Sequence, residues 1–161
     1  MSKEKLIKTN AMRILDSKKI NYEMISYACN DGQIDGISVA KKIGEEEKRV
    51  FKTLVAQGSS KEIYVYVIPV ADELDLKKSA IITKEKKIEM IHVKDILKYT
   101  GYIRGGCSPI GLKRNYKIFV HESAKDLDYI IFSAGKIGYQ IKMKPSDLLY
   151  IVEGKFENLI K

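Results

Sequence analysis

Four glycines fall within one short segment of the chain, at positions 101, 105, 106 and 111, although all 161 residues include only 11 glycines. Glycine is favoured where φ must be positive or where another group approaches the main chain closely. Ser108 and Pro109 then fix a bend, which leaves neighbouring N–H groups free to point at a ligand. Three basic residues flank the segment and favour an anionic ligand: Arg104, Lys113 and Arg114. A plain connecting loop fits the spacing equally well, because neither the Walker nor the dinucleotide pattern is matched.

Lys52 is the most unusual charged residue, because it lies within the apolar run 50–56. With a period of two it shares one strand face with Val50, Leu54 and Ala56. One interpretation is a lysine on an edge strand that extends its ammonium group out of the core. The other is a lysine that points into a cleft, where desolvation lowers its pKa and suits it to donate to a carbonyl or phosphate oxygen.

A second pair of glycines, Gly135 and Gly138, lies in the segment 133–138 between two expected strands. The segment suits a plain hairpin, but Ser133 and Gly135 could also face the first loop across a pocket. Tyr27 lies at the end of an expected strand, where its ring could stack on a base or pack in the core.

The remaining reactive side chains favour structural roles. Cys107 could be a nucleophile, but no base is adjacent in the sequence, so a small residue chosen for fit is preferred. Cys29 is expected to be buried and inert. His92 and His121 have no partner at metal-ligand spacing, so no metal site is expected. Of the acidic residues that follow the strand ending at Pro69, Asp75 is best explained as a helix cap.

The balance of charge narrows the class of partner. Lys and Arg number 29 and Asp and Glu 21, which gives a formal charge of +8 and a pI near 9.3. Such an excess suits nucleic acid or an anionic membrane, although a lysine-rich composition alone could produce it. Two cysteines make no disulfide framework, and no apolar run reaches the length of a membrane span. A cytoplasmic protein without a membrane partner is therefore expected.

The order of elements indicates one α+β domain over residues 1–161, with a curved or partly closed sheet. Helices are expected near residues 11–18, 35–43, 76–81, 93–99 and from 145 onward, where Pro145 occupies a first turn. Strands are expected at 22–27, 50–57, 62–68, 88–90, 116–120, 129–132 and 139–143. Residues 58–61 form the turn of a hairpin between the second and third of these strands.

Taken together, these segments resemble the YbaK/EbsC-type aminoacyl-tRNA deacylase family, over about residues 11–159. The pieces that carry the resemblance are VFKTLV at 50–55, PVA at 69–71 with LDLKK at 74–78, TGY at 100–102, GGCSPIG at 105–111, SAGK at 133–136 and DL at 147–148. The loop at 105–111 and the pattern at 74–78 look most like the YbaK branch, which clears cysteine mischarged onto proline tRNA.

This resemblance implies a mixed, mostly antiparallel, barrel-like sheet with flanking helices, related to the editing insertion of bacterial prolyl-tRNA synthetases. It implies that Lys52 is the key active-site residue, with no cofactor and no metal. The implied substrate-binding positions lie in the same motifs: Tyr27, Thr53, Gly101, Gly105, Gly106, Ser108, Pro109, Ser133 and Gly135. One departure is Gln140, which stands where some members carry an acidic residue, whereas Asp147 is retained.

The implied function is trans-editing of Cys-tRNA(Pro), with the substrate's own thiol attacking its ester. An aminoacyl ester is labile, so such a site needs orientation and oxyanion stabilisation but no protein nucleophile. Two alternatives are a deacylase for another small residue, such as Ala-tRNA(Pro), and a non-catalytic RNA-binding module. The expected partners are the acceptor end of aminoacyl-tRNA and a prolyl-tRNA synthetase. The acceptor stem is expected on a basic surface formed by Lys77, Lys78, Lys113 and Arg114.

Overall fold

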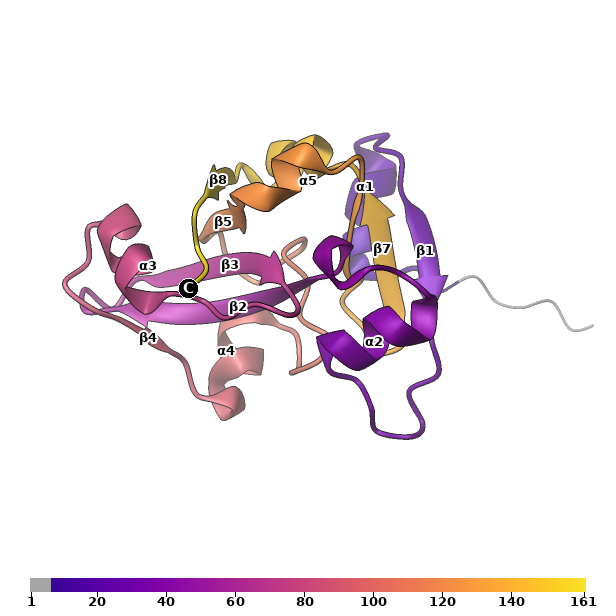
Figure 1. Cartoon of the computed structure of the whole chain (residues 1–161), viewed down its shortest axis with the longest axis horizontal. Coiled ribbons are helices and arrows are strands. Elements are labelled where there is room, and N and C mark those ends of the chain that lie inside the picture. The colour runs from indigo at the N-terminus through magenta and orange to yellow at the C-terminus, as the bar shows by residue number, and fades with distance from the viewer. Residues whose placement is uncertain (1–6) are drawn as a thin grey trace, which may run out of the picture.

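A computed structural model of the chain describes residues 7–161 and contains short helices around two sheets (Figure 1). The α-helices are α1 (Asn10–Ser17), α2 (Gly36–Ile43), α3 (Leu76–Thr83), α4 (Ile96–Thr100) and α5 (Pro145–Val152). The strands are β1 (Glu23–Ser26), β2 (Phe51–Gly58), β3 (Ile63–Pro69), β4 (Ile88–Met90), β5 (Lys117–His121), β6 (Ile130–Ser133), β7 (Tyr139–Met143) and β8 (Lys155–Glu157). Three 3₁₀ turns complete the described part: η1 (Glu47–Arg49), η2 (Val93–Asp95) and η3 (Glu122–Asp126).

Local sequence explains where the helices begin and end. Thr9 caps α1 by accepting from the Met12 amide, and Asp35 caps α2 by accepting from the Ser38 amide. Asp75 accepts from the amides of Lys77 and Lys78, which confirms its predicted role as the cap of α3. Such caps satisfy amides that have no partner inside the helix. Gly44 ends α2 in the left-handed conformation that glycine adopts without strain.

The strands form one sheet of order β4-β2-β3-β5-β8 and another of order β1-β7-β6. Pairing is antiparallel in β1–β7, β6–β7, β2–β3 and β2–β4, and parallel in β3–β5 and β5–β8. A parallel bridge between Val50 and Ile131 brings β6 against the beginning of β2 and joins the two sheets. The α+β class and the mixed sheet are as predicted, but the sheets curve without closing into a barrel.

Strand β2 separates three apolar clusters. Phe51 and Val55 face the main core, together with β5, β6, β7 and α1. On the opposite face, Ala56 and Leu54 belong to a cluster under α3. Val50 packs with Val70, Ile131 and Ala40 of α2 in a third cluster. The predicted shared face of residues 50, 54 and 56 is therefore confirmed, and α2 and α3 cover that face at opposite ends of β2 (Figure 1).

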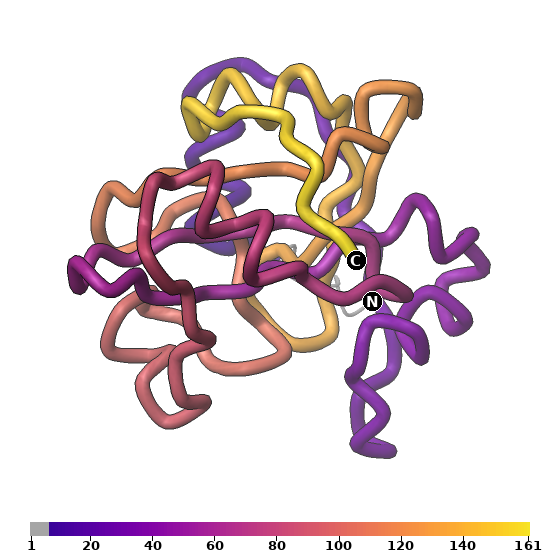
Figure 2. Tube along the Cα trace, turned by 60° about the vertical axis from the view of Figure 1, so that its left-hand side comes forward, coloured from indigo at the N-terminus to yellow at the C-terminus, as the bar shows by residue number. Residues whose placement is uncertain are grey.

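Most predicted elements are present within a residue or two, and the exceptions are short. The helix expected at 93–99 is split into η2 and α4. Strand β8, with its three residues, was not predicted from the sequence, because a pattern of alternation needs more length. Figures 1 and 2 show α2 and the loop before it at the end of the molecule away from the tip of the β2–β3 hairpin. No helix within residues 7–161 combines the length and apolar character that crossing a membrane requires.

Candidate active site

A row of polar side chains crosses the junction between the two sheets, on the face that α2 covers. Lys52 and Ser133 each follow the Val50–Ile131 bridge by two residues. Because opposite residues of parallel strands point to the same face, both side chains emerge beside α2. Gln140 pairs directly with Ser133 across β6 and β7 and is only 5% exposed. The fold therefore brings Lys52, Ser133 and Gln140 together, although 88 positions separate the first and the last.

Tyr27 extends this row at its other end. Ile25 pairs with Gln140 and packs in the cluster under α2, and Tyr27 lies two residues further on the same face. The Tyr27 amide donates to the Gly138 carbonyl at 2.9 Å. Above the ring, the Lys42 ammonium of α2 lies 5.8 Å from the centroid, close enough for a cation–π contact. Lys42 was not predicted as a site residue.

The two glycine segments and the loop before α2 meet at this end of the molecule. A Cβ on Gly105 would lie 2.8 Å from Ile34 Cδ1, and one on Gly106 would lie 3.2 Å from the amide nitrogen of Ile137. A Cβ on Gly135 would lie 2.8 Å from the Tyr102 ring, whose hydroxyl donates to the Ile110 carbonyl. Gly105 and Gly135 also have φ of +84° and +97°, so positive φ and close approach together favour glycine in these segments.

Lys52 is held beside the first residue of α2. Its ammonium group donates to the Val70 carbonyl at 3.3 Å. Val70 in turn leaves room only for glycine at the start of α2, because a Cβ on Gly36 would lie 2.3 Å from Val70 Cγ1. Ile34, two positions earlier, contacts Gly105. The N-terminus of α2 thus lies between Lys52 and the glycine-rich loop.

Other predicted site residues point toward the main core instead of the row. Thr53 alternates with Lys52 and therefore faces the same side of β2 as Phe51 and Val55. Ser108 is fully buried, and its hydroxyl accepts from the Ile110 amide at 3.3 Å. Pro109 is buried beside it, while Gly101 ends α4 with a φ of +81°. These residues shape the loop, and direct contact of their side chains with substrate stays a prediction.

Four buried side-chain hydroxyls have no hydrogen-bond partner among residues 7–161: Tyr27 Oη, Thr53 Oγ1, Tyr66 Oη and Ser123 Oγ. Of these residues, Thr53 is next to Lys52 in the sequence and Tyr27 lies in the row. A buried polar group without a partner costs about 1–3 kcal/mol. Buried polar groups are nearly always paired, so exceptions need an explanation. Tyr27 belongs to the row, whereas Thr53 faces the other side of β2, so a polar ligand bound at the row would supply a partner to the Tyr27 hydroxyl.

The two cysteines differ in burial: Cys107 is buried and Cys29 is exposed. Cys107 packs in the main core, and burial raises the pKa of its thiol to about 11. A thiol of this kind is a poor nucleophile at neutral pH, because the thiolate is the reactive form. Cys29 was predicted to be buried, and this is wrong: it is exposed. It lies in the loop after β1, where the polar residues Asn30 and Asp31 follow it.

The basic residues expected to form one surface are divided between two faces. Lys77 and Lys78 lie on α3, whose apolar side packs on the cluster with Leu54. Lys113 approaches α4, where its ammonium group donates to the Lys98 carbonyl at 3.5 Å. Tyr99 of α4 packs on the main core, across β2 from α3 (Figure 1). The four residues therefore cannot form a single docking surface.

Within the described residues, no cluster of three His, Cys, Asp or Glu side chains is arranged to hold a metal ion. His121 is buried, and burial lowers the pKa of its imidazole. Its Nδ1 accepts from the Leu159 amide at 3.2 Å, which is a structural role. The chemistry available at the row is that of an ammonium donor, an amide, hydroxyls and main-chain N–H groups.

Comparison with known proteins agrees with this arrangement. Residues 35–151 match the model of a family described as the aminoacyl-tRNA editing domain. The chain is 44% identical over 152 residues to EbsC of Enterococcus faecalis, and the match covers 94% of this chain and 93% of EbsC. The name of EbsC provisionally describes EbsC as a Cys-tRNA(Pro)/Cys-tRNA(Cys) deacylase. It is 27% identical over 109 residues to the uncharacterised YwhH of Bacillus subtilis, covering 68% of this chain and 69% of that protein.

Two solved structures share the fold. A crystal structure described as a candidate trans-editing enzyme for prolyl-tRNA synthetase has a TM-score of 0.82 at 16% identity, covering 95% of this chain and 98% of that one. The hypothetical protein APE2540 has a TM-score of 0.84 at 15% identity, covering 92% and 97%. At such identities the likeness shows only that the fold is shared. The family model and the 44% identity to EbsC show in addition that the sequences are homologous. The chain belongs to the aminoacyl-tRNA editing domain family.

Proposed function

We propose that this protein is a trans-editing enzyme that removes cysteine from mischarged Cys-tRNA(Pro). Family membership supports aminoacyl-tRNA deacylation. The observation that carries the proposal is the row Lys52–Ser133–Gln140–Tyr27 beside the glycine loops, in which the buried Tyr27 hydroxyl has no partner among the described residues. A site built in this way offers hydrogen bonds to a polar ligand and lacks an activated nucleophile.

Lys52 acts as a donor to an oxygen of the substrate. Its present partner is a single carbonyl at 3.3 Å, so the ammonium group has further N–H donors available. Placed against the ester carbonyl or the terminal phosphate, it would stabilise negative charge that develops during attack. Main-chain N–H groups of the glycine loop would hold the same oxygen or the terminal nucleotide.

Gln140 limits the chemistry that the site itself can perform. An amide donates and accepts hydrogen bonds but does not take up a proton at neutral pH. Gln140 therefore orients the substrate where a carboxylate in some relatives could act as a base. The buried Cys107 thiol is also unsuited to attack, because its pKa is raised to about 11.

The attacking group is then the thiol of the substrate cysteine. It loses its proton to solvent, its sulfur forms a bond to the ester carbonyl carbon, and the carbonyl oxygen becomes an oxyanion. Collapse of this intermediate breaks the bond to the ribose oxygen, which takes up a proton, and releases tRNA and a cyclic thioester. The protein contributes orientation and charge stabilisation, as expected for a reaction that is intramolecular.

One measurement tests the proposal: release of tRNA from Cys-tRNA(Pro) by the purified protein, compared with Ser-tRNA(Pro), Ala-tRNA(Pro) and Pro-tRNA(Pro). Cysteine should be released fastest, and serine, which differs only in oxygen for sulfur, should be released much more slowly. Equal release of alanine would identify a deacylase that selects by size, since a pocket discriminates one methylene by only about 1–3 kcal/mol. Binding of tRNA without any release would identify a non-catalytic RNA-binding module.

Selection of the tRNA is proposed to depend on the amino acid and on prolyl-tRNA synthetase, because a chain of 161 residues reaches little beyond the acceptor end. Adding the synthetase should raise the rate on freshly mischarged tRNA if the two proteins associate. An unchanged rate at every synthetase concentration would show that the deacylase acts alone.

A further inference from the structure

The β1–α2 loop (residues 28–34) is a segment that the apolar core does not hold in place. Residues 28–33 are all exposed, and Ile34 is partly buried. The chain reverses at Gly32, which has a φ of +76° and whose amide donates to the Cys29 carbonyl at 3.2 Å. A segment with so little buried apolar surface opens easily unless another interaction holds it.

The ammonium group of Lys42, on α2, supplies that interaction. It donates to the carbonyls of Ala28 and Gln33 at 2.6 Å and 2.9 Å. It also donates to Asp31 Oδ1 at 2.7 Å. Within residues 7–161, every hydrogen bond between the β1–α2 loop and the rest of the chain comes from this one group.

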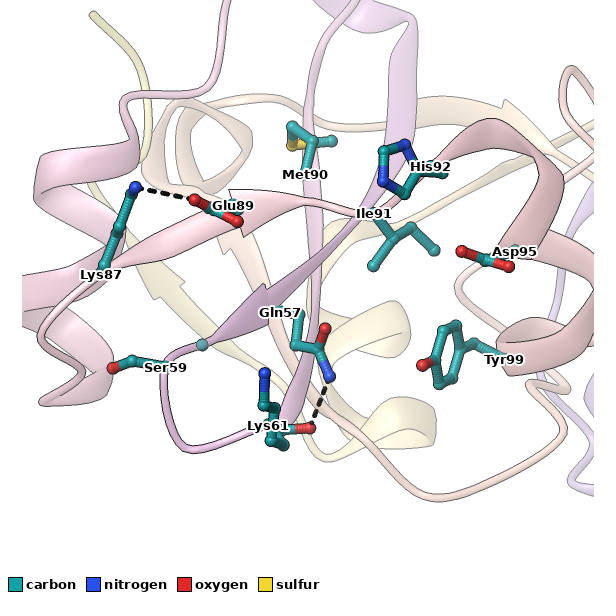
Figure 3. A pocket seen from close by; sticks show the side chains of 11 residues that line it. Gln57, Ser59, Lys61, Lys87, Glu89, Met90, Ile91, His92, Asp95 and Tyr99 are labelled. Carbon is teal, nitrogen blue, oxygen red and sulfur yellow. Dashed lines mark hydrogen bonds and ion pairs between the residues drawn. The ribbon is translucent and has the colours of Figure 1, made fainter.

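Lys42 differs in this respect from a lysine in an ordinary surface ion pair. Lys87, which lines a pocket near the tip of the β2–β3 hairpin, binds Glu89 at 2.7 Å (Figure 3). Their side chains are 72% and 66% exposed, and pairs of this kind contribute little to stability. The Lys42 side chain is only 19% exposed and binds three acceptors, so its bonds are partly shielded from water.

The two carbonyls that Lys42 binds belong to residues next to the proposed active site. Ala28 follows Tyr27, whose ring belongs to the row and has its centroid 5.8 Å from the Lys42 ammonium group. Gln33 precedes Ile34, whose side chain contacts the glycine-rich loop. Lys42 therefore fixes the β1–α2 loop at both ends, one beside the row and the other beside the glycine-rich loop.

The hydrogen bonds of Lys42 leave it no donor for substrate. An ammonium group has three N–H donors, and Lys42 uses all three within the protein. Lys52 differs, because its ammonium group makes a single hydrogen bond to the described part of the chain. An effect of Lys42 on the reaction must therefore pass through the loop.

We propose that Lys42 is a positioning residue for deacylation, which holds the β1–α2 loop as one side of the substrate site. This inference rests on the proposed function. A loop that is already held in the free protein does not have to be ordered when substrate binds. Without Lys42, the cost of ordering the loop is taken from the free energy of binding. Loss of Lys42 therefore raises KM more than it lowers kcat.

Steady-state deacylation of Cys-tRNA(Pro) by Lys42→Met tests this inference, because methionine keeps most of the side-chain length and removes the N–H donors. KM should rise at least about fivefold, and kcat should stay within about twofold. In hydrogen exchange followed by mass spectrometry, peptides from residues 28–34 should exchange faster than in the parent, and peptides from β3 should not. Lys41→Met is the matched control, because Lys41 is exposed in the same last turn of α2. It should change neither quantity.

Asp31→Ala tests the same contact from the side of the loop. Asp31 is 47% exposed, so this variant keeps the inference testable even if Lys42→Met unfolds. It should raise KM about twofold to threefold in the parent and have little further effect in Lys42→Met, because the two residues share one ion pair. Additive effects of the two substitutions would contradict the inference.

The inference and the proposed function fail in different ways. Unchanged KM and unchanged exchange at residues 28–34 in an active Lys42→Met protein would overturn the inference alone, and so would a fall in kcat at constant KM. A parent protein that prefers another mischarged tRNA would refute the proposed function, and KM and kcat measured on that tRNA would still decide the role of Lys42. A parent that releases no amino acid from any of these tRNAs would refute both.

Discussion

The two ends of β2 differ in whether their polar side chains have hydrogen-bond partners. At the hairpin end, the Glu85 carboxylate accepts from the Ser60 amide at 3.0 Å and from the hydroxyls of Ser60 and Tyr64. At the Lys52 end, the hydroxyls of Tyr27 and Thr53 are buried with no partner within residues 7–161. The first arrangement is complete without a ligand. The second carries a cost of burial, as do Tyr66 and Ser123 outside the row, and of these residues it is Tyr27 that lies where substrate is proposed to bind.

The largest expected effect is on the deacylation rate, and it comes from a substitution at the Lys52 end of β2. Lys52→Ala should lower the rate of deacylation at least about tenfold, equivalent to about 1.4 kcal/mol of transition-state stabilisation, while the protein stays folded. The reason is that the Lys52 ammonium group belongs to the row and makes a single hydrogen bond to the part of the chain that the structure describes. Single-turnover deacylation and thermal unfolding measure the two quantities.

Lys41→Ala is the matched control, because Lys41 is exposed on α2. It should leave the rate within about twofold, as expected for a surface charge. A folded Lys52→Ala protein with an undiminished rate would mean that the row is not the active site.

A pair of hydroxyl deletions tests the comparison itself. Thr53→Val should raise the free energy of unfolding by about 1 kcal/mol, because it removes a buried hydroxyl without a partner. The family resemblance, which places Thr53 among the substrate-binding positions, predicts that the same change also lowers deacylation. Tyr64→Phe should do the reverse, destabilising the fold with little change in rate, because its hydroxyl already donates to Glu85 at 2.6 Å. Urea unfolding combined with deacylation rates would refute the comparison if both variants lost stability alike.

Sequence reasoning found the strand faces but not the pairing that assembles the site. Period-two alternation placed Lys52 on the face of Val50, Leu54 and Ala56, as the structure has it. The bridge between Val50 and Ile131 could not be predicted, because it joins segments far apart in the chain and no local pattern encodes it. That bridge is what places Ser133 and Gln140 beside Lys52. Gln140 was singled out only as a departure from the family.

The glycine-rich segments were recognised by composition, but their neighbours were not. Ile34 and Ile137, which contact Gly105 and Gly106, are ordinary apolar residues with no signal of their own. The exposure of Cys29 was predicted wrongly, because cysteine is most often buried and the surrounding loop was not foreseen. The cap at Asp75 was predicted correctly because capping depends on local sequence alone.

A smaller effect concerns pH at the hairpin end. Hydrogen bonds from Ser60 and Tyr64 lower the pKa of Glu85 from 4.5 to about 2. A lowered carboxylate pKa contributes stability that is present above the unfolded value of 4.5 and is lost as pH falls toward 2. Glu85→Gln should therefore be less stable than the parent at pH 6, and the difference should shrink by pH 3. A difference that stays constant over this interval would show that the charge of Glu85 contributes nothing.

The smallest expected effect tests whether the glycine-rich loop acts by shape or by sulfur. Burial raises the pKa of the Cys107 thiol to about 11, so only about one molecule in 10⁴ carries the thiolate at pH 7. Cys107→Ala keeps a small side chain between Gly106 and Ser108, and deacylation should stay within about twofold of the parent. Stability should fall slightly, because the thiol packs in the main core. Complete loss of activity in a folded Cys107→Ala protein, or an acyl group trapped on Cys107 by mass spectrometry, would show instead that the protein supplies the attacking sulfur.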